Sequence, residues 1–271
     1  MKLSHIGALA TLLAAGPALA ADLAPRAAPP EWQPKPAQVY AAPIFTHTGF
    51  YVGMNGGYGW NGGRFANIPA GSWAGSANAM TVALAGSGAT PSGGWAAGGQ
   101  LGYNRQFGAF VLGAETDLDY LGARRRTVFA TPTAGGFVIA QTETGAGDLL
   151  GTARLRAGAA FGKALVYATG GLAYGRVGAT QTLIFPTSIA YGSQAGLKLG
   201  WALGAGAEYA ILPNWTLRAE YLHADLGQSR ATLWNAAFPT FPHLFRTTTH
   251  VDLARAGLNY RFGAPAPYGR W

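Results

Sequence analysis

From Gly49 onward the chain alternates between apolar side chains at one parity and small or polar side chains at the other. In one such segment, Leu199, Trp201 and Leu203 stand on the opposite parity to Lys198 and Glu208. A period of two is typical of a β-strand whose two faces meet different surroundings. The pattern predicts strands over residues 49–60, 95–107, 110–121, 149–161, 164–175, 197–209, 215–226 and 251–262.

Each predicted strand is long enough to cross a bilayer, which takes about 9–11 residues when the strand is tilted. Long connections (61–94, 122–148, 176–196, 227–250) alternate with short ones (108–109, 162–163, 210–214). Outer-membrane barrels have short periplasmic turns and long surface loops, so both ends of the chain are expected in the periplasm. The sequence thus predicts an all-β protein, an eight-stranded antiparallel up-and-down transmembrane β-barrel with four long extracellular loops.

Aromatic residues gather at both ends of these segments, on the apolar parity. Amphipathic rings favour the headgroup level of a membrane, so two aromatic girdles are expected on the outward face. A soluble β-sandwich or lipocalin-like fold would share the alternation but would lack these two belts. The predicted girdles contain Phe50, Trp60, Trp95, Phe107, Phe110, Tyr120, Phe161, Tyr174, Tyr209, Trp215 and Phe262.

The inward parity carries five acids and six bases. The interior of an eight-stranded barrel is just wide enough to be filled by side chains. Charges buried there would be costly unless they pair with one another. We therefore expect a lumen largely closed by ion pairs, with a small conductance as the alternative. The predicted network comprises Glu115, Asp117, Asp119, Glu208 and Glu220 with Arg154, Arg156, Lys198, Arg218, Arg255 and Arg261.

The two ends of the chain show different patterns. Residues 1–20 indicate a signal peptide, with Lys2, a short apolar stretch and the small-x-small sequence 18–20. The Pro-rich residues 21–48 indicate an extended periplasmic linker. The barrel is expected over 49–262 and a C-terminal extension over 263–271. Either Phe262 or Trp271 could be the terminal aromatic residue that serves as the assembly signal.

Composition removes several classes of function. The chain has no Cys, so a disulfide framework and a Cys-based zinc site are excluded, and no His spacing suggests a metal or another cofactor. The net charge of +8 is spread along the chain, which argues against nucleic-acid binding. A lipid-modifying enzyme would need a nucleophile, a base and an acid together, and His223, Asp225 and Ser229 are the candidates. His223 and Asp225 lie two residues apart on one strand without a suitable nucleophile between them, so we expect no enzyme.

Five stretches of the predicted strands carry recognisable motifs: 49–53 (GFYVG), 99–104 (GQLGYN), 165–175 (LVYATGGLAYG), 218–222 (RAEYL) and 257–262 (GLNYRF). Together they resemble the alphaproteobacterial outer-membrane β-barrel family of OmpA/opacity-type surface antigens. The resemblance covers roughly 45–262 and implies an abundant, eight-stranded outer-membrane protein of a Gram-negative bacterium, with a structural, surface-antigen or porin-like role.

The expected function is that of an integral outer-membrane β-barrel in the cell envelope, with two alternatives. One is a small porin-like channel, and the other is an adhesin or ligand-binding protein acting through its loops. Expected partners are outer-membrane lipid and, during biogenesis, periplasmic chaperones and the barrel-assembly machinery. Lipopolysaccharide is a further expected partner because each long connection carries an arginine. These arginines are Arg64, Arg124, Arg176 and Arg230. The oligomeric state is left open.

Overall fold

A computed structural model describes residues 45–73, 75–76, 78–89, 91–122, 124–133 and 136–262. The predicted signal peptide, all but the last residues of the linker, and the extension 263–271 lie outside this part of the chain. No helix in the described part is long and apolar enough to cross a membrane. The strands are β1 (Gly49–Asn61), β2 (Arg64–Pro69), β3 (Gly88–Ala89), β4 (Ser92–Phe107), β5 (Phe110–Leu121), β6 (Arg124–Thr133), β7 (Gly136–Phe161), β8 (Ala164–Phe185), β9 (Ser188–Leu212), β10 (Trp215–Asn235) and β11 (His243–Phe262), with a 3-10 turn η1 (Gly71–Trp73) and one helix, α1 (Ala79–Ala85).

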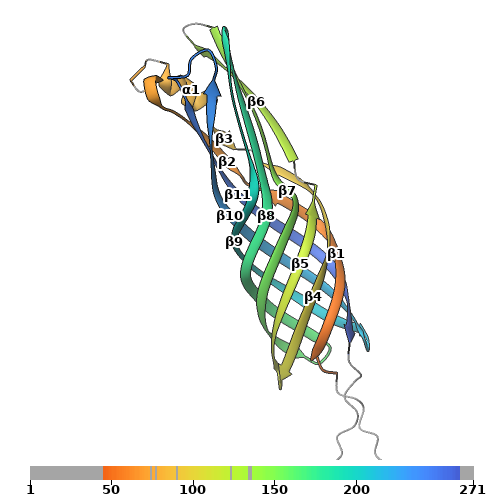
Figure 1. Cartoon of the computed structure of the whole chain (residues 1–271). Helices are drawn as coiled ribbons and strands as arrows, with labels where there is room; N and C mark the ends of the chain where they lie inside the picture. The colour runs from red at the N-terminus through yellow and green to blue at the C-terminus, as the bar shows by residue number, and fades with distance from the viewer. Residues whose placement is uncertain are drawn as a thin grey trace, which may run out of the picture. The chain divides into compact units, whose positions relative to one another are not determined.

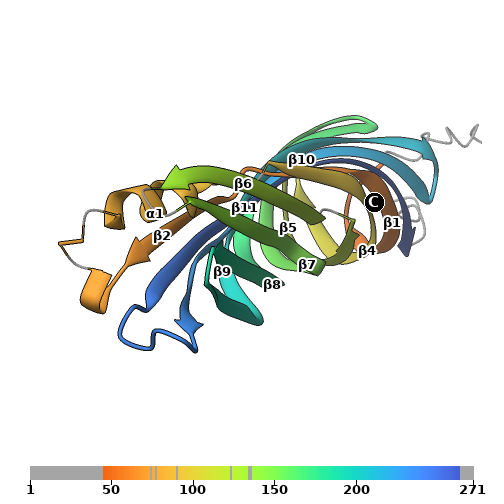
Figure 2. The same ribbon diagram turned by 90° about the horizontal axis from the view of Figure 1, so that it is seen from above.

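The strands form one antiparallel sheet that closes on itself (Figures 1 and 2). They pair in the order β1-β4-β5-β7-β8-β9-β10-β11, and β1 also pairs with β11. Phe50 of β1 therefore has Tyr103 of β4 on one side and Phe262 of β11 on the other. Closure leaves no unpaired edge within the ring, which is what a sheet surrounded by lipid requires.

Two of the short connections are tight turns as expected. Gly108 and Gly162 have φ angles of 61° and 62°, a left-handed conformation that glycine adopts without steric cost. The third predicted turn, 210–214, is shorter than expected because β9 continues to Leu212 and β10 begins at Trp215.

The long connections differ most from the sequence-based prediction, because most of their residues are in strands. β8 and β9 run to Phe185 and from Ser188, so the predicted loop 176–196 is a hairpin with a two-residue connection. β7 begins at Gly136 and pairs with β6, so much of 122–148 is also a hairpin. Among the described residues of the long connections, irregular structure is concentrated in 236–242 and in 62–91, where it joins β2, η1, α1 and β3. We call the extension the set of β2, β3, β6, η1 and α1 with the parts of β7 to β11 beyond the spanning segments. It is distinct from the C-terminal residues 263–271.

The extension escaped prediction because its polarity is inverted relative to the barrel. In the barrel the outward parity is apolar, whereas in the extension the inward parity carries the apolar core and the outward parity mixes polar and apolar residues. Val138, Leu183 and Phe245 are fully buried inward, while Thr182 and Arg246 lie on the other face of their strands. The sequence criterion for a spanning strand, apolar residues on the outward parity, is therefore no longer met beyond the spanning segments.

Inside the extension is a separate hydrophobic core. Phe65 of β2 and Val82 of α1 pack with residues of β7 to β11, and Trp73 of η1 stacks on Phe185 at 6.0 Å between ring centroids. Buried hydrogen bonds cross this core: Asn67 Nδ2 donates to Gln181 Oε1 at 2.9 Å. In Figure 1 α1, β2, β3 and β6 lie beside the far ends of the long strands. The extension is therefore a folded unit continuous with the ring.

Candidate functional site: the charged interior of the barrel

Five carboxylates and four arginines meet inside the ring. They come from β5, β7, β9, β10 and β11, and the inward parity of each strand points them into the lumen. Each of these side chains is at least 95% buried. The cluster comprises Glu115, Asp117, Asp119, Arg154, Arg156, Glu208, Arg218, Glu220 and Arg255.

Glu115 is the acceptor for one half of this cluster. Arg218 donates to both of its oxygens, Nη1 to Oε2 at 2.6 Å and Nη2 to Oε1 at 2.7 Å. Arg154 Nη2 reaches Glu115 Oε1 at 2.7 Å, and Arg156 Nη1 lies 3.6 Å from Oε2. The fork of Arg218 matches the two oxygens of a carboxylate, an arrangement that fixes orientation and strengthens both hydrogen bonds.

The other half is built on the two aspartates of β5. Arg255 Nη1 contacts Asp119 Oδ2 at 2.5 Å and Arg255 Nη2 contacts Asp117 Oδ2 at 2.9 Å. Arg154 contacts the same Asp117 oxygen and also Glu220, so it joins the two halves. Thr152 Oγ1 donates to Asp117 Oδ2 at 2.9 Å. The contacts form one connected network rather than isolated pairs, which offsets more of the cost of burying charge.

Two tyrosines complete the network, and sequence reasoning missed them. Tyr51 Oη donates to Glu115 Oε2 at 2.5 Å, and Arg156 Nη1 donates to Tyr51 Oη at 2.9 Å. Tyr167 Oη donates to Glu220 Oε2 at 3.2 Å while its ring lies under the Arg156 guanidinium, 3.7 Å from it. The signal that could have found both is a tyrosine on the inward parity, where most other aromatics are outward.

Inward glycines make space for these rings. A Cβ on Gly102 would lie 2.3 Å from Tyr51 Oη, and one on Gly206 would lie 2.5 Å from Tyr167 Oη. Part of the glycine content of the spanning strands is therefore explained by the size of the tyrosines directly opposite them on neighbouring strands.

Two predicted members lie outside the network. Lys198 is only half-buried, and its Nζ lies 3.4 Å from the Gln228 carbonyl oxygen, to which it donates a weak hydrogen bond. Arg261 donates to the Pro213 carbonyl at 2.8 Å and lies over the ring of Phe45, 4.4 Å from its centroid. Both face inward as expected, but they lie at the two ends of the lumen, away from the carboxylates.

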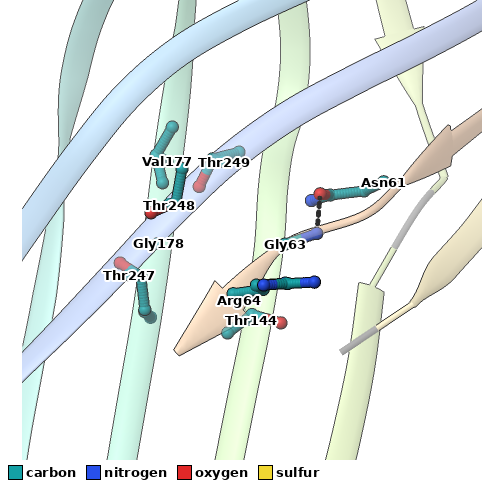
Figure 3. Close-up of a pocket in the computed structure, with 10 residues that line it drawn as sticks. Asn61, Gly63, Arg64, Thr144, Val177, Gly178, Thr247, Thr248 and Thr249 are labelled. Atoms are coloured by element: carbon teal, nitrogen blue, oxygen red, sulfur yellow. Dashed lines mark hydrogen bonds between the residues drawn. The ribbon is translucent and has the colours of Figure 1, made fainter. Parts of the chain in front are cut away.

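Apolar layers bound the charged cluster on both sides. On one side lie four leucines, each two residues along its strand from a network residue and each at most 1% exposed. They are Leu121, Leu150, Leu222 and Leu253. Val111, Ala160 and Leu165 form a smaller cluster near the short turns. Beyond the leucines, a cavity of about 10 Å³ is lined by Asn61, Thr144 and Thr247 among others (Figure 3), which is room for about one water. This stacking of layers fits a closed lumen.

The residues predicted for the aromatic girdles lie on the outer face of the ring. Phe110 and Phe161 are about 70% exposed, and Trp95 stacks beside Tyr120 at 5.2 Å between centroids. Tyr174 is half-buried because its ring covers Gly151 of the neighbouring strand. The other predicted members, Phe50, Trp60, Phe107, Tyr209, Trp215 and Phe262, are all exposed to solvent in the isolated chain.

The residues weighed for a lipid-modifying enzyme do not come together. His223 Nδ1 lies 2.7 Å from Asp252 Oδ1 on the neighbouring strand, and Tyr221 Oη donates to the same oxygen. Asp225 Oδ1 accepts from the Gly227 backbone N–H, and the side chain of Ser229 is buried on the opposite face. Within the described residues, no group of three or more His, Cys, Asp or Glu side chains could hold a metal ion.

Residues 34–262 match the protein family described as the outer membrane protein β-barrel domain. The chain belongs to this family. It is also 37% identical to the 31 kDa outer-membrane immunogenic protein of Brucella melitensis, over 84% of this chain and 90% of that protein. The 25 kDa outer-membrane immunogenic protein of Brucella abortus is 25% identical, over 86% of this chain and 87% of that protein.

Among solved structures, Ail, the attachment invasion locus protein of Yersinia pestis, overlaps with a TM-score of 0.36 and 13% identity. The overlap covers 79% of this chain and 99% of Ail, a likeness too distant to bear on activity. Family membership and the Brucella relatives place this outer-membrane β-barrel protein in the outer membrane of a Gram-negative bacterium, as a surface protein.

Proposed function

We propose that this outer-membrane β-barrel protein is a structural surface protein of the envelope, built on eight spanning strands with a closed lumen and no enzymatic activity. The spanning unit would be the ring β1-β4-β5-β7-β8-β9-β10-β11, with β2, β3 and β6 belonging to the extension. The observation that carries the closed lumen is the connected network around Glu115, Arg154 and Arg255, bounded by layers of buried leucine.

The remaining parts of the chain fit this scheme. Residues 1–20 would direct export, 21–48 would lie in the periplasm, and the short turns at Gly108 and Gly162 would face the periplasm with both chain ends. Periplasmic chaperones and the barrel-assembly machinery would be partners during biogenesis. The exposed aromatic residues at the two ends of the ring support this placement, because such belts mark the two membrane interfaces.

Planar-bilayer recording separates the closed barrel from a porin-like channel. We expect the purified chain to insert without large, stable conductance steps, because buried ion pairs and buried leucines occupy the interior of the ring. A general porin reconstituted in parallel verifies that steps would be detected. Large, stable steps would contradict the closed lumen and favour the porin-like alternative. A deletion strain should show increased entry of large antibiotics if the structural role is right.

A further inference from the structure

Three arginines lie together on the outer face of the extension. Arg230 of β10 is directly opposite Arg246 of β11 in the antiparallel register. On the other side of β11, Arg64 of β2 is opposite Thr248, two residues from Arg246. Directly opposite residues have Cβ atoms about 4.5–5.5 Å apart, so Arg230 and Arg246 share one small area.

No carboxylate neutralises these charges in the described part of the chain. Neither Arg64, Arg230 nor Arg246 makes an ion pair there, and the buried Arg246 Nε has no hydrogen-bond partner. The exposed acid Glu143 is paired with Arg126 instead. Like charges directly opposite on neighbouring strands are destabilising, so this arrangement calls for an anion between them.

A β-bulge produces the arrangement. Up to Asp225 the even residues of β10 face inward, as Arg218 and Glu220 do, and Arg230 would follow them. The register shifts by one residue between Asp225 and Gln228, at Gly227, whose φ is 73°. After the shift Ser229 is buried and Arg230 is exposed. Bulges commonly re-aim a side chain in this way.

The surface beside the arginines is hollowed. An open hollow of about 430 Å³ is lined by Arg64, Arg246 and Thr248, together with Phe65, Ala66, Gly88 and Ala89. The two guanidinium groups at this hollow are charged donors, and no carboxylate lines it. Arginine in particular recognises phosphate through paired hydrogen bonds.

The height of the cluster above the aromatic girdle points to the ligand. Asp252 is opposite Trp60, and Arg246 lies six residues further along β11. At about 3.3 Å per residue and a tilt near 40°, this places Arg246 about 15 Å beyond Trp60. Arg64, four residues after Trp60 on the strand that continues β1 along β11, lies about 10 Å beyond it. The arginines therefore point outward about 10–15 Å beyond the girdle residue Trp60, on the side of the extension.

We propose that Arg64, Arg230 and Arg246 form a binding site for the phosphate groups of lipopolysaccharide in the surrounding outer leaflet. The proposal rests on the orientation proposed above, with the extension outside the cell. Loop cations near phosphate-bearing lipid are attracted in a general way. Here the bulge, the opposed arginines and the hollow define one particular site.

The test uses the full mature chain in detergent micelles, titrated with lipid A carrying two phosphates and with dephosphorylated lipid A. Arg230→Gln/Arg246→Gln removes two members of the site. Arg126→Gln/Arg176→Gln is the matched control, since it removes the same charge from exposed positions elsewhere in β6 and β8. Gel mobility with and without boiling verifies that each variant is folded. Binding in micelles does not depend on how the protein is oriented in the outer membrane. A loss of binding would therefore contradict the site itself and not the proposed orientation.

The wild type and the control should bind phosphorylated lipid A alike, and the site variant about tenfold more weakly. Arg230→Glu should abolish binding yet raise the unfolding temperature without lipid, because the new carboxylate faces Arg246. Equal loss in site variant and control would overturn the proposal. Equal binding of phosphorylated and dephosphorylated lipid A would also overturn it. Complete displacement of lipid A by millimolar inorganic phosphate would overturn it too and would assign the site to the free anion.

Discussion

Arg154 has three carboxylate partners in the described interior, as many as Arg255 has. It contacts Glu115, Asp117 and Glu220, and its Nε donates to Thr152 Oγ1 at 2.8 Å. The side chain is completely buried, so each of these partners depends on Arg154 for neutralisation in a place that water does not reach.

Arg154→Met should therefore destabilise the barrel by about 3–5 kcal/mol, because it leaves buried carboxylates without their partner. Lys198→Met removes the same charge from the same parity but outside the network, and should change stability by less than about 0.5 kcal/mol. Urea unfolding in detergent, followed by tryptophan fluorescence, measures both. Similar losses in the two variants would mean that the network does not stabilise the fold.

Parity in the sequence determines which way a side chain points, but not how deep in the lumen it lies. This explains why nine of the eleven predicted network residues meet while Lys198 and Arg261 lie near the ends. It also explains why Tyr51 and Tyr167 were missed. Their phenol groups become network members only because glycines on neighbouring strands leave room, and that pairing depends on the register between strands.

At the scale of elements, β7 to β11 each pass through two surroundings. Within the ring their outward face is apolar, and in the extension their inward face is. The alternation that locates the spanning segments therefore ends where the polarity inverts, and the sequence pattern predicts loops for the extension. The bulge at Gly227 was equally hidden, because a one-residue shift is visible only when the partner strand is known.

His243 belongs to the core of the extension and gives it a pH dependence. It is buried beside Trp73 and Phe185, and its Nδ1 lies 3.1 Å from Asn67 Oδ1. Burial lowers the pKa of His243 from its ordinary value of 6.5 to about 4. The folded state favours the neutral ring, so this contribution to stability is present above pH 6.5 and is lost as the pH falls toward 4.

Hydrogen exchange in β2 and α1 should accordingly speed up between pH 6.5 and pH 4, after correction for intrinsic rates. Exchange in β4 and β5, which lack this histidine, should change less. His243→Gln keeps a hydrogen-bonding side chain without a titration in this range, and its exchange should lose most of the pH dependence. An unchanged dependence in that variant would assign the effect to another group.

At the scale of the whole molecule, the closed ring and the alternation of short and long connections imply a single orientation. Because the chain contains no Cys, single cysteines can report it. Ala237 lies exposed between β10 and β11, and Lys163 lies exposed in the turn between β7 and β8. Ala237→Cys should react with a membrane-impermeant maleimide on intact cells, whereas Lys163→Cys should react only after the outer membrane is opened. The reverse pattern would invert the proposed orientation.

The separate core of the extension also affects how antibodies recognise the protein. A flexible loop displays its residues as a linear stretch of sequence, which a short peptide can imitate. Here the exposed segments are strands and a helix held by Phe65, Val82 and Phe245, and neighbouring surface residues come from distant parts of the chain. Antibodies raised against the folded protein should therefore recognise mainly conformational epitopes, and synthetic peptides from 61–94 or 227–250 should compete poorly for them.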